Sequence, residues 1–140
     1  MRIYSIVLFL LLLTYGCSNR EVTVRSNSRE ATIDTGSRFA NALVEKRYGD
    51  ASSMLTVDLK KSWSEEKLRS QYEEMISYGS GPVKVDGHTE FLEEWPDRKP
   101  GDVGWAYISI SGSDFAEAIT VVVAEENGEP KIRDLQWGRP

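Results

Sequence analysis

The hydrophobic period of the sequence changes at Pro82, and this change constrains the fold more than any other feature. Before Pro82, apolar residues recur at the three- and four-residue spacing of amphipathic helices. After it, they alternate as in strands, and the strand segments are separated by short turns. Helices followed by a run of antiparallel strands make an α+β fold.

Two helices are predicted before Pro82. The first begins at a cap within 34–37 and ends near Gly49, and one of its faces carries Phe39, Ala42, Leu43 and Lys46 at the spacing i, i+3, i+4, i+7. A further turn or two is expected over 50–55. The second begins at Ser64 and stops at Gly79, and its apolar stripe is Leu68, Tyr72, Met75 and Ile76.

Strands are predicted over 83–95 (one or two strands around Asp86-Gly87), 104–111, 115–125 and 131–137. The dipeptide Asn127-Gly128 predicts a tight hairpin, because both central positions of a type I′ turn need positive φ. In strict alternation, Ile132 would face away from Leu135 and Trp137. Either both faces of the last strand are covered, or a bulge intervenes.

The N-terminus has the pattern of a secretory signal peptide. Arg2 precedes a mainly apolar run over 3–13, which is too short to cross a hydrocarbon core of ~30 Å. This stretch resembles the signal peptides of bacterial lipoproteins, whose lipobox ends in a lipidated cysteine, here Leu13 to Gly16 and Cys17. The resemblance implies cleavage after Gly16, thioether lipidation and N-acylation of Cys17, and insertion of these acyl chains into a membrane of the cell envelope. Ser18 resembles the pattern for outer-membrane sorting in a Gram-negative host. The alternative is an ordinary secreted protein with one free thiol.

Three regions are therefore expected: a signal peptide over 1–16, a lipidated Cys17 with a polar tether over 17–33, and a folded domain over 34–140. Cys17 is the only cysteine of the 140 residues, so packing without a disulfide must stabilise the domain. The formal net charge of −5 argues against general nucleic-acid binding, which needs a basic surface.

The folded region resembles the nuclear transport factor 2-like, or ketosteroid isomerase-like, proteins. The resemblance spans roughly 34–140 and implies a cone, in which N-terminal helices pack on a bent antiparallel sheet. The residues that carry it are Phe39, Ala42, Leu43, Tyr48, Ala51 and Leu55, and then Asn127, Gly128, Ile132 and Leu135.

Aromatic residues are candidates for the pocket of such a cone, where they offer apolar walls with polar groups. Equally, they could fill the core of a small domain. The candidates are Tyr48, Trp63, Tyr72, Tyr78, Trp105, Tyr107 and Trp137. Glu117 joins them, because it shares a strand face with Ile119 and Val121. On a concave face it would be a buried carboxylate with a raised pKa, and on a convex face an ordinary surface charge.

Other catalytic chemistry has little support in the sequence. Asp58 is a second candidate carboxylate. Asp86, His88 and Glu90 alternate and could bind a divalent metal or form a general-base pair, but Gly87 suggests a bulge that would disrupt their common face. No phosphate-binding loop, zinc-protease or serine-hydrolase motif is present, and no cofactor or metal is expected.

Three functions remain open. The first is a non-catalytic lipoprotein domain that binds a small ligand or an envelope protein. The second is an enzyme of the isomerase, dehydratase or cyclase type that uses a buried carboxylate such as Glu117 or Asp58. The third is a structural or immunity-type interaction protein, with the sheet as an interface and a homodimer as one possibility.

Overall fold

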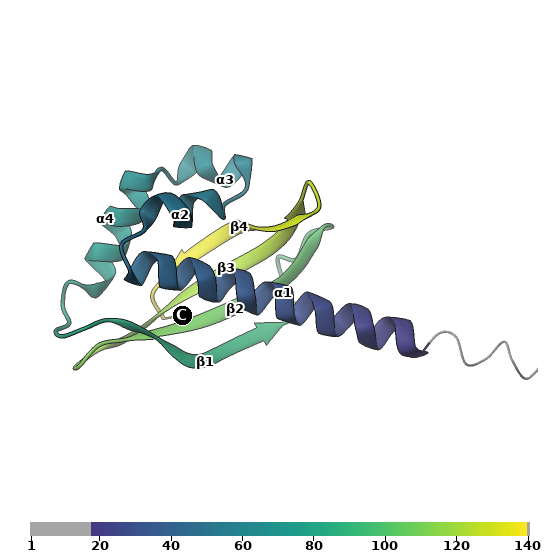
Figure 1. The fold of residues 1–140 in the computed structure, drawn as a ribbon, viewed down its shortest axis with the longest axis horizontal. Coiled ribbons are helices and arrows are strands. Elements are labelled where there is room, and N and C mark those ends of the chain that lie inside the picture. Colours follow the sequence, from purple (N-terminus) through teal and green to yellow (C-terminus); the bar gives the residue numbers. More distant parts are fainter. Residues whose placement is uncertain (1–17, 140) are drawn as a thin grey trace, which may run out of the picture.

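The structure is a computed structural model that describes the backbone of residues 18–139 and the side chains of 27–139 except that of His88. Within this range, four helices lie on one side of a four-stranded antiparallel sheet (Figure 1). The strand order is β1-β2-β3-β4, and the arrangement is roughly cone-like. The predicted α+β fold is confirmed. The elements are α1 (Ser18–Val44), α2 (Tyr48–Ser53), α3 (Val57–Ser62), α4 (Glu65–Ile76), β1 (Lys84–Leu92), β2 (Asp102–Ser111), β3 (Ala116–Glu126) and β4 (Glu129–Trp137).

The first helix begins much earlier than the sequence predicts. Residues from Ser18 onward are helical, although 18–33 show no helical period in the sequence, and the domain boundary expected at 34 lies inside α1. Thr32, Thr35 and Gly36 are all buried in α1. Because these buried residues are small or polar, they create no apolar stripe in the sequence. Cys17 lies outside the described residues.

Two glycines allow α1 to cross the sheet at close range. A Cβ atom at Gly36 would lie 2.8 Å from Ile108 Cδ1, and one at Gly104 of β2 would lie 2.5 Å from Thr32 Oγ1. Thr32 itself donates from Oγ1 to the carbonyl of Ser28 at 2.8 Å, so its hydroxyl is satisfied in this tight contact. The helix therefore packs closely over β2 and β3.

The remaining helices are short and begin at identifiable caps. Lys46 has a φ of 59° and ends the turn after α1, so Gly49 is not the stop of that helix and lies within α2. Thr56 caps α3, which the sequence does not predict, by accepting from the backbone N–H of Leu59 at 3.2 Å. Ser64 caps α4, as predicted.

Irregular register in two strands decides which side chains face the helices. The pairing of β1 with β2 shifts between Val85 and Thr89, which confirms the bulge suggested by Gly87. In β4, Asp134 pairs with Val122 of β3 and Ile132 pairs with Val123, so Arg133 is the extra residue of a bulge. As a result Ile132 and Leu135 are both buried in the core, so the bulge alternative is correct.

We expect Gly36→Leu to lower the free energy of unfolding by about 2 kcal/mol, because the larger side chain must displace Ile108 or lift α1 from the sheet. Gly87→Leu is the matched control, since a Cβ atom at Gly87 would have no neighbour within 4 Å. Urea unfolding followed by circular dichroism measures both effects. Equal losses for the two variants would contradict close packing of α1 at Gly36.

Candidate functional site

The aromatic residues expected to line one pocket lie in separate pairs. The rings of Tyr48 and Tyr72 have centroids 6.5 Å apart, those of Trp63 and Trp137 are 5.7 Å apart, and those of Trp105 and Tyr107 are 6.4 Å apart. The first two pairs belong to the helix-covered side of the sheet. The third pair alternates along β2 with buried core residues and therefore points to the opposite side.

The tyrosine pair belongs to the core between α2 and α4. Tyr48 and Tyr72 are 5% and 1% exposed, and Tyr48 Oη donates to Glu73 Oε1 at 3.4 Å. Burial, followed by the nearby charge of Glu73, raises the pKa of Tyr48. Burial raises the pKa of Tyr72 to about 12. Both rings belong to the buried core, which was the alternative to a pocket.

The tryptophan pair packs on the core where α3 ends against β4. Trp63 and Trp137 are both half-buried, and Lys67 Nζ lies 4.3 Å from the centroid of the Trp63 ring. The Nε1–H of Trp137 is buried and donates to no group among the described residues. This pair also contributes apolar packing at the edge of the core.

Neither candidate carboxylate lies deep in the cone. Glu117 is half-buried near the start of β3, where Oε1 accepts from the hydroxyl of Tyr78 and Oε2 accepts from the backbone N–H of Arg139 at 3.2 Å. The hydrogen bond to Glu117 raises the pKa of Tyr78, yet Tyr78 is 62% exposed. The Asp58 side chain is 89% exposed and accepts from Lys61 Nζ at 2.7 Å, which lowers the pKa of Asp58. Water has access to both sites.

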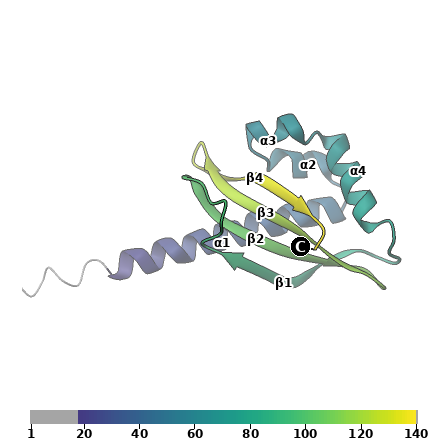
Figure 2. The same cartoon turned by 180° about the vertical axis from the view of Figure 1, so that it is seen from behind.

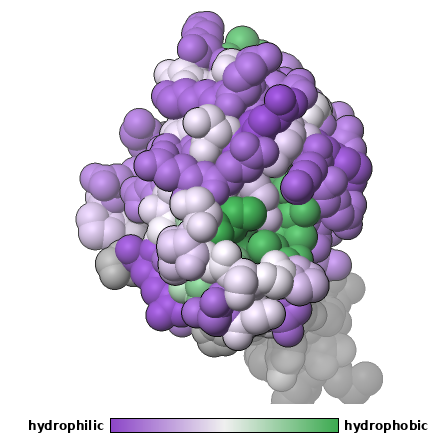
Figure 3. Space-filling model, turned by 90° about the vertical axis from the view of Figure 1, so that its left-hand side faces the viewer, coloured by the Kyte–Doolittle hydropathy of each residue, from purple (hydrophilic) through white to green (hydrophobic). Residues whose placement is uncertain are grey.

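An apolar patch lies at the end of the molecule where α1 and α4 finish and β1 begins (Figure 3). Polar side chains surround it on this face. The segments that meet at this end contribute half-buried apolar side chains packed on the core, namely Val44, Ile76, Val83 and Val85. The patch is continuous with the core and offers few polar groups for orienting a ligand.

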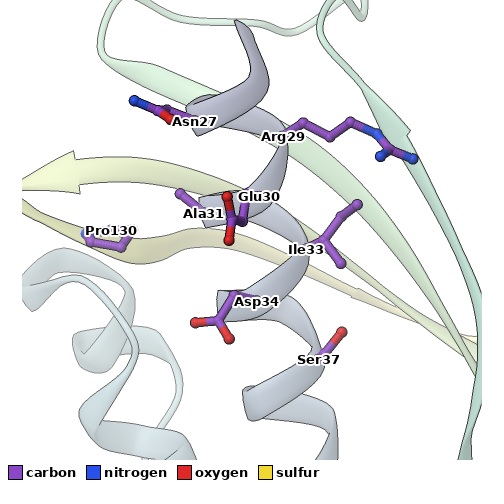
Figure 4. Close-up of a pocket in the computed structure, with 8 residues that line it drawn as sticks. All are labelled: Asn27, Arg29, Glu30, Ala31, Ile33, Asp34, Ser37 and Pro130. Carbon is purple, nitrogen blue, oxygen red and sulfur yellow. The ribbon is translucent and has the colours of Figure 1, made fainter. Parts of the chain in front are cut away.

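A wide hollow, with a volume of about 940 Å³, follows the exposed side of α1. Figure 4 shows that its side chains project from one helix in different directions, with Pro130 at one side, and do not converge on a common point. A ligand site needs convergent polar groups. We therefore regard this hollow as an open helix surface; its lining residues are Asn27, Arg29, Glu30, Ala31, Ile33, Asp34, Ser37 and Pro130.

The opposite side of the sheet, which we call the outer face, carries no helix within residues 18–139 (Figure 2). Two rows of paired side chains cross it from β2 through β3 to β4. One row is Trp105, Val122 and Asp134, and the other is Tyr107, Thr120 and Gln136. Trp105 and Tyr107 are half-buried, with their ring planes inclined by only 23°. An aromatic surface with polar groups beside it is typical of a binding site.

The loop between β1 and β2 folds back over the outer face and forms a small cleft, which we call the Trp95 cleft. Its volume is about 40 Å³. Trp95 Nε1–H is buried and donates to no described group, while carboxylate, amide and hydroxyl oxygens lie among the lining residues. The lining residues are Trp95, Asp97, Trp105, Thr120, Val122, Asp134, Leu135 and Gln136.

An ion pair between β2 and β4 holds this loop in place. Arg133 donates from Nη2 to Asp102 Oδ2 at 2.6 Å and from Nε to Oδ1, and Nη2 also donates to the carbonyl of Asp97 at 3.3 Å. Asp102 Oδ2 accepts from the backbone N–H of Lys99 at 2.7 Å. Burial acts to raise the pKa of Asp102, but the hydrogen bonds from Arg133 and Lys99 outweigh it and hold the pKa below its usual range.

The sequence does not single out Trp95, Asp134 or Gln136 as site residues. The available signal is period-two alternation, since Asp134 and Gln136 flank the buried Leu135 on β4. That signal becomes usable only when the bulge at Arg133 is known. Trp95 follows β1 in a loop with no regular period.

The described residues offer no metal site and no membrane span. No three His, Cys, Asp or Glu side chains among them lie close enough to hold an ion, and the side chain of His88 is outside the described set. Asp86 accepts from Ser111 Oγ at 2.8 Å. None of the described helices combines the length and apolar character needed to cross a bilayer. Comparison with protein-family models, curated proteins and solved structures found no match.

We expect Asp102→Asn to lower the free energy of unfolding by roughly 3 kcal/mol at pH 7. The substitution removes the negative charge that pairs with Arg133 and so leaves a mostly buried guanidinium without its partner. The wild-type contribution is present above the unfolded pKa of about 4 and is lost as the pH falls through the lower folded pKa. The difference in the free energy of unfolding between wild type and Asp102→Asn should therefore become smaller in acid.

Urea unfolding at pH 7 and pH 2.5 measures this gap. Asp58→Asn is the control, since its ion pair with Lys61 is exposed and should add little to the urea midpoint. A gap that stays constant with pH, or equal losses for the two variants, would show that the Asp102–Arg133 pair does not stabilise the loop.

Proposed function

We propose that this chain is an exported lipoprotein, anchored through Cys17, whose folded domain is a non-catalytic binding module. The observation that carries the binding role is the helix-free outer face, where Trp105 and Tyr107 lie beside the Trp95 cleft. Half-buried aromatic residues with polar neighbours are enriched at binding surfaces. The anchor is inferred from the resemblance of residues 1–17 to lipoprotein signal peptides.

We also propose that the domain has a nuclear transport factor 2-like cone. Support comes from the element order, with all helices before the sheet, and from the long α1 that crosses one face of a four-stranded antiparallel sheet. In such a cone the helices occupy one face, so the other face is available to a ligand or a partner protein.

An enzyme of the isomerase or dehydratase type is a second candidate, favoured by the hydrogen bond from Tyr78 to Glu117. A carboxylate beside a phenol can act as an acid–base pair. Catalysis of this type gains from a site that excludes water, and Tyr78 is largely exposed. This exposure is the reason to place the binding role first.

The lipid anchor is tested by metabolic labelling with a radioactive or alkyne-tagged fatty acid. We expect label on the wild-type chain and none on Cys17→Ser, because the thioether needs the only thiol of the sequence. Both proteins are recovered by an affinity tag, so that equal amounts are compared. Equal labelling of the two chains would rule out the anchor.

The binding face is tested by replacing Tyr107 with a photo-crosslinking phenylalanine derivative in the tagged chain expressed in its host cells. We expect irradiation to give a product of higher mass, because a bound ligand or protein would lie against this position. The same replacement at the exposed Lys60 of α3 is the control. Products of equal yield at the two positions, or none at either, would count against the outer face as the binding surface.

A further inference from the structure

We infer that the Trp95 cleft and the neighbouring Trp105–Tyr107 pair form a binding site for a neutral glycan. This inference rests on the proposed binding function of the outer face and names its ligand class. The site brings together a buried donor, several acceptors and two nearly parallel aromatic rings.

The hydrogen-bonding groups of the cleft favour a ligand that both donates and accepts. Trp95 contributes an indole N–H that can only donate, and it has no acceptor among the described residues. Asp134 and Gln136, which also line the cleft, contribute acceptors, and Asp134 Oδ1 already accepts from the backbone N–H of Leu135 at 3.0 Å. A hydroxyl group can accept from an N–H and donate to a carboxylate or an amide oxygen at the same time.

The volume of the cleft limits what can enter it. About 40 Å³ is enough for one hydroxyl or hydroxymethyl group and is far below the 300–1,000 Å³ typical of sites that enclose a whole ligand. The rest of the ligand must therefore lie outside, over Trp105 and Tyr107. The C–H groups on one face of a pyranose ring are apolar and pack against aromatic rings, whereas the hydroxyl groups project from the ring edge.

The charges of the site disfavour two other ligand classes, anions and cations. Asp97 and Asp134 line the cleft of a chain with net charge −5, which disfavours phosphates and nucleic acid. An ammonium or guanidinium group only donates hydrogen bonds and would leave Trp95 Nε1–H without an acceptor. In addition, the guanidinium of Arg98 lies 5.8 Å from the centroid of the Trp95 ring and supplies a cation there within the chain. A neutral polyhydroxy ligand meets both constraints.

The inference is tested on the full chain purified in detergent micelles, by titration with two defined neutral probes, cellotetraose and tetra-N-acetylchitotetraose. We expect one of them to change the tryptophan fluorescence in a saturable manner and to bind in isothermal titration calorimetry. Trp105→Ala should weaken binding about tenfold or more, because it removes the aromatic surface. Asp134→Asn should also weaken it several-fold, through loss of a charged acceptor.

Trp63→Ala is the matched control, because it removes a tryptophan from the helix-covered side of the sheet and should leave the affinity within about twofold of wild type. Circular dichroism and the urea midpoint show whether each variant is folded. Asp134→Asn, which keeps the shape of the side chain, decides the result if Trp105→Ala is unstable.

Three outcomes would overturn the glycan site. One is absence of saturable binding of either probe at millimolar concentration. Another is binding that Trp105→Ala and Asp134→Asn leave unchanged. The third is displacement of the probe by a lysine-rich peptide, which would assign the cleft to a basic protein segment. In each case a crosslinked product at Tyr107 would still support the outer face as a binding surface, so the ligand class and the proposed function can fail separately.

Discussion

The close contact between α1 and the sheet is the constraint on which the rest of the structure depends. Gly36 and Gly104 remove the side chains that would hold the two apart, and Thr32 fits between them with its hydroxyl bonded to its own helix. Because α1 spans the middle of one sheet face, the shorter helices can only complete that same layer beside it (Figure 1). The second face is left without a helical layer and becomes the surface available for recognition.

The sequence predicts those parts of the fold that local physics determines. The cap at Ser64 and the apolar stripe of α4 are local features, and so is the turn at Asn127 and Gly128, whose φ values are 55° and 80°. The part of α1 before residue 34 could not be predicted in this way, because Thr32, a polar residue, is the only buried side chain described there. Small side chains at the contact let the helix lie close to the sheet. Because such side chains are not large and apolar, they also leave no apolar period by which a helix could be recognised in the sequence.

The candidate site shows a similar division. Alternation along β2 places Trp105 and Tyr107 on one strand face, but it does not say whether helices cover that face. The answer depends on α1, which contacts β2 from the other side. The Trp95 cleft depends further on the bulge at Arg133 and on its ion pair with Asp102, two residues far apart in the chain. Contacts of this kind arise only in the folded molecule, so no local pattern indicates them.

The two faces of the sheet are suited to separate tasks. An anchor on Cys17 would be joined directly to α1, which begins at the next residue, so the helix rather than a flexible tether would connect the bilayer to the domain. At ~1.5 Å of rise per residue, each helical turn before the sheet moves the domain a fixed distance from the lipid. Because α1 lies on the helix-covered side, it does not obstruct Trp105 and Tyr107. A rigid connection on one face would therefore leave the outer face accessible to a ligand while the chain remained bound to the membrane.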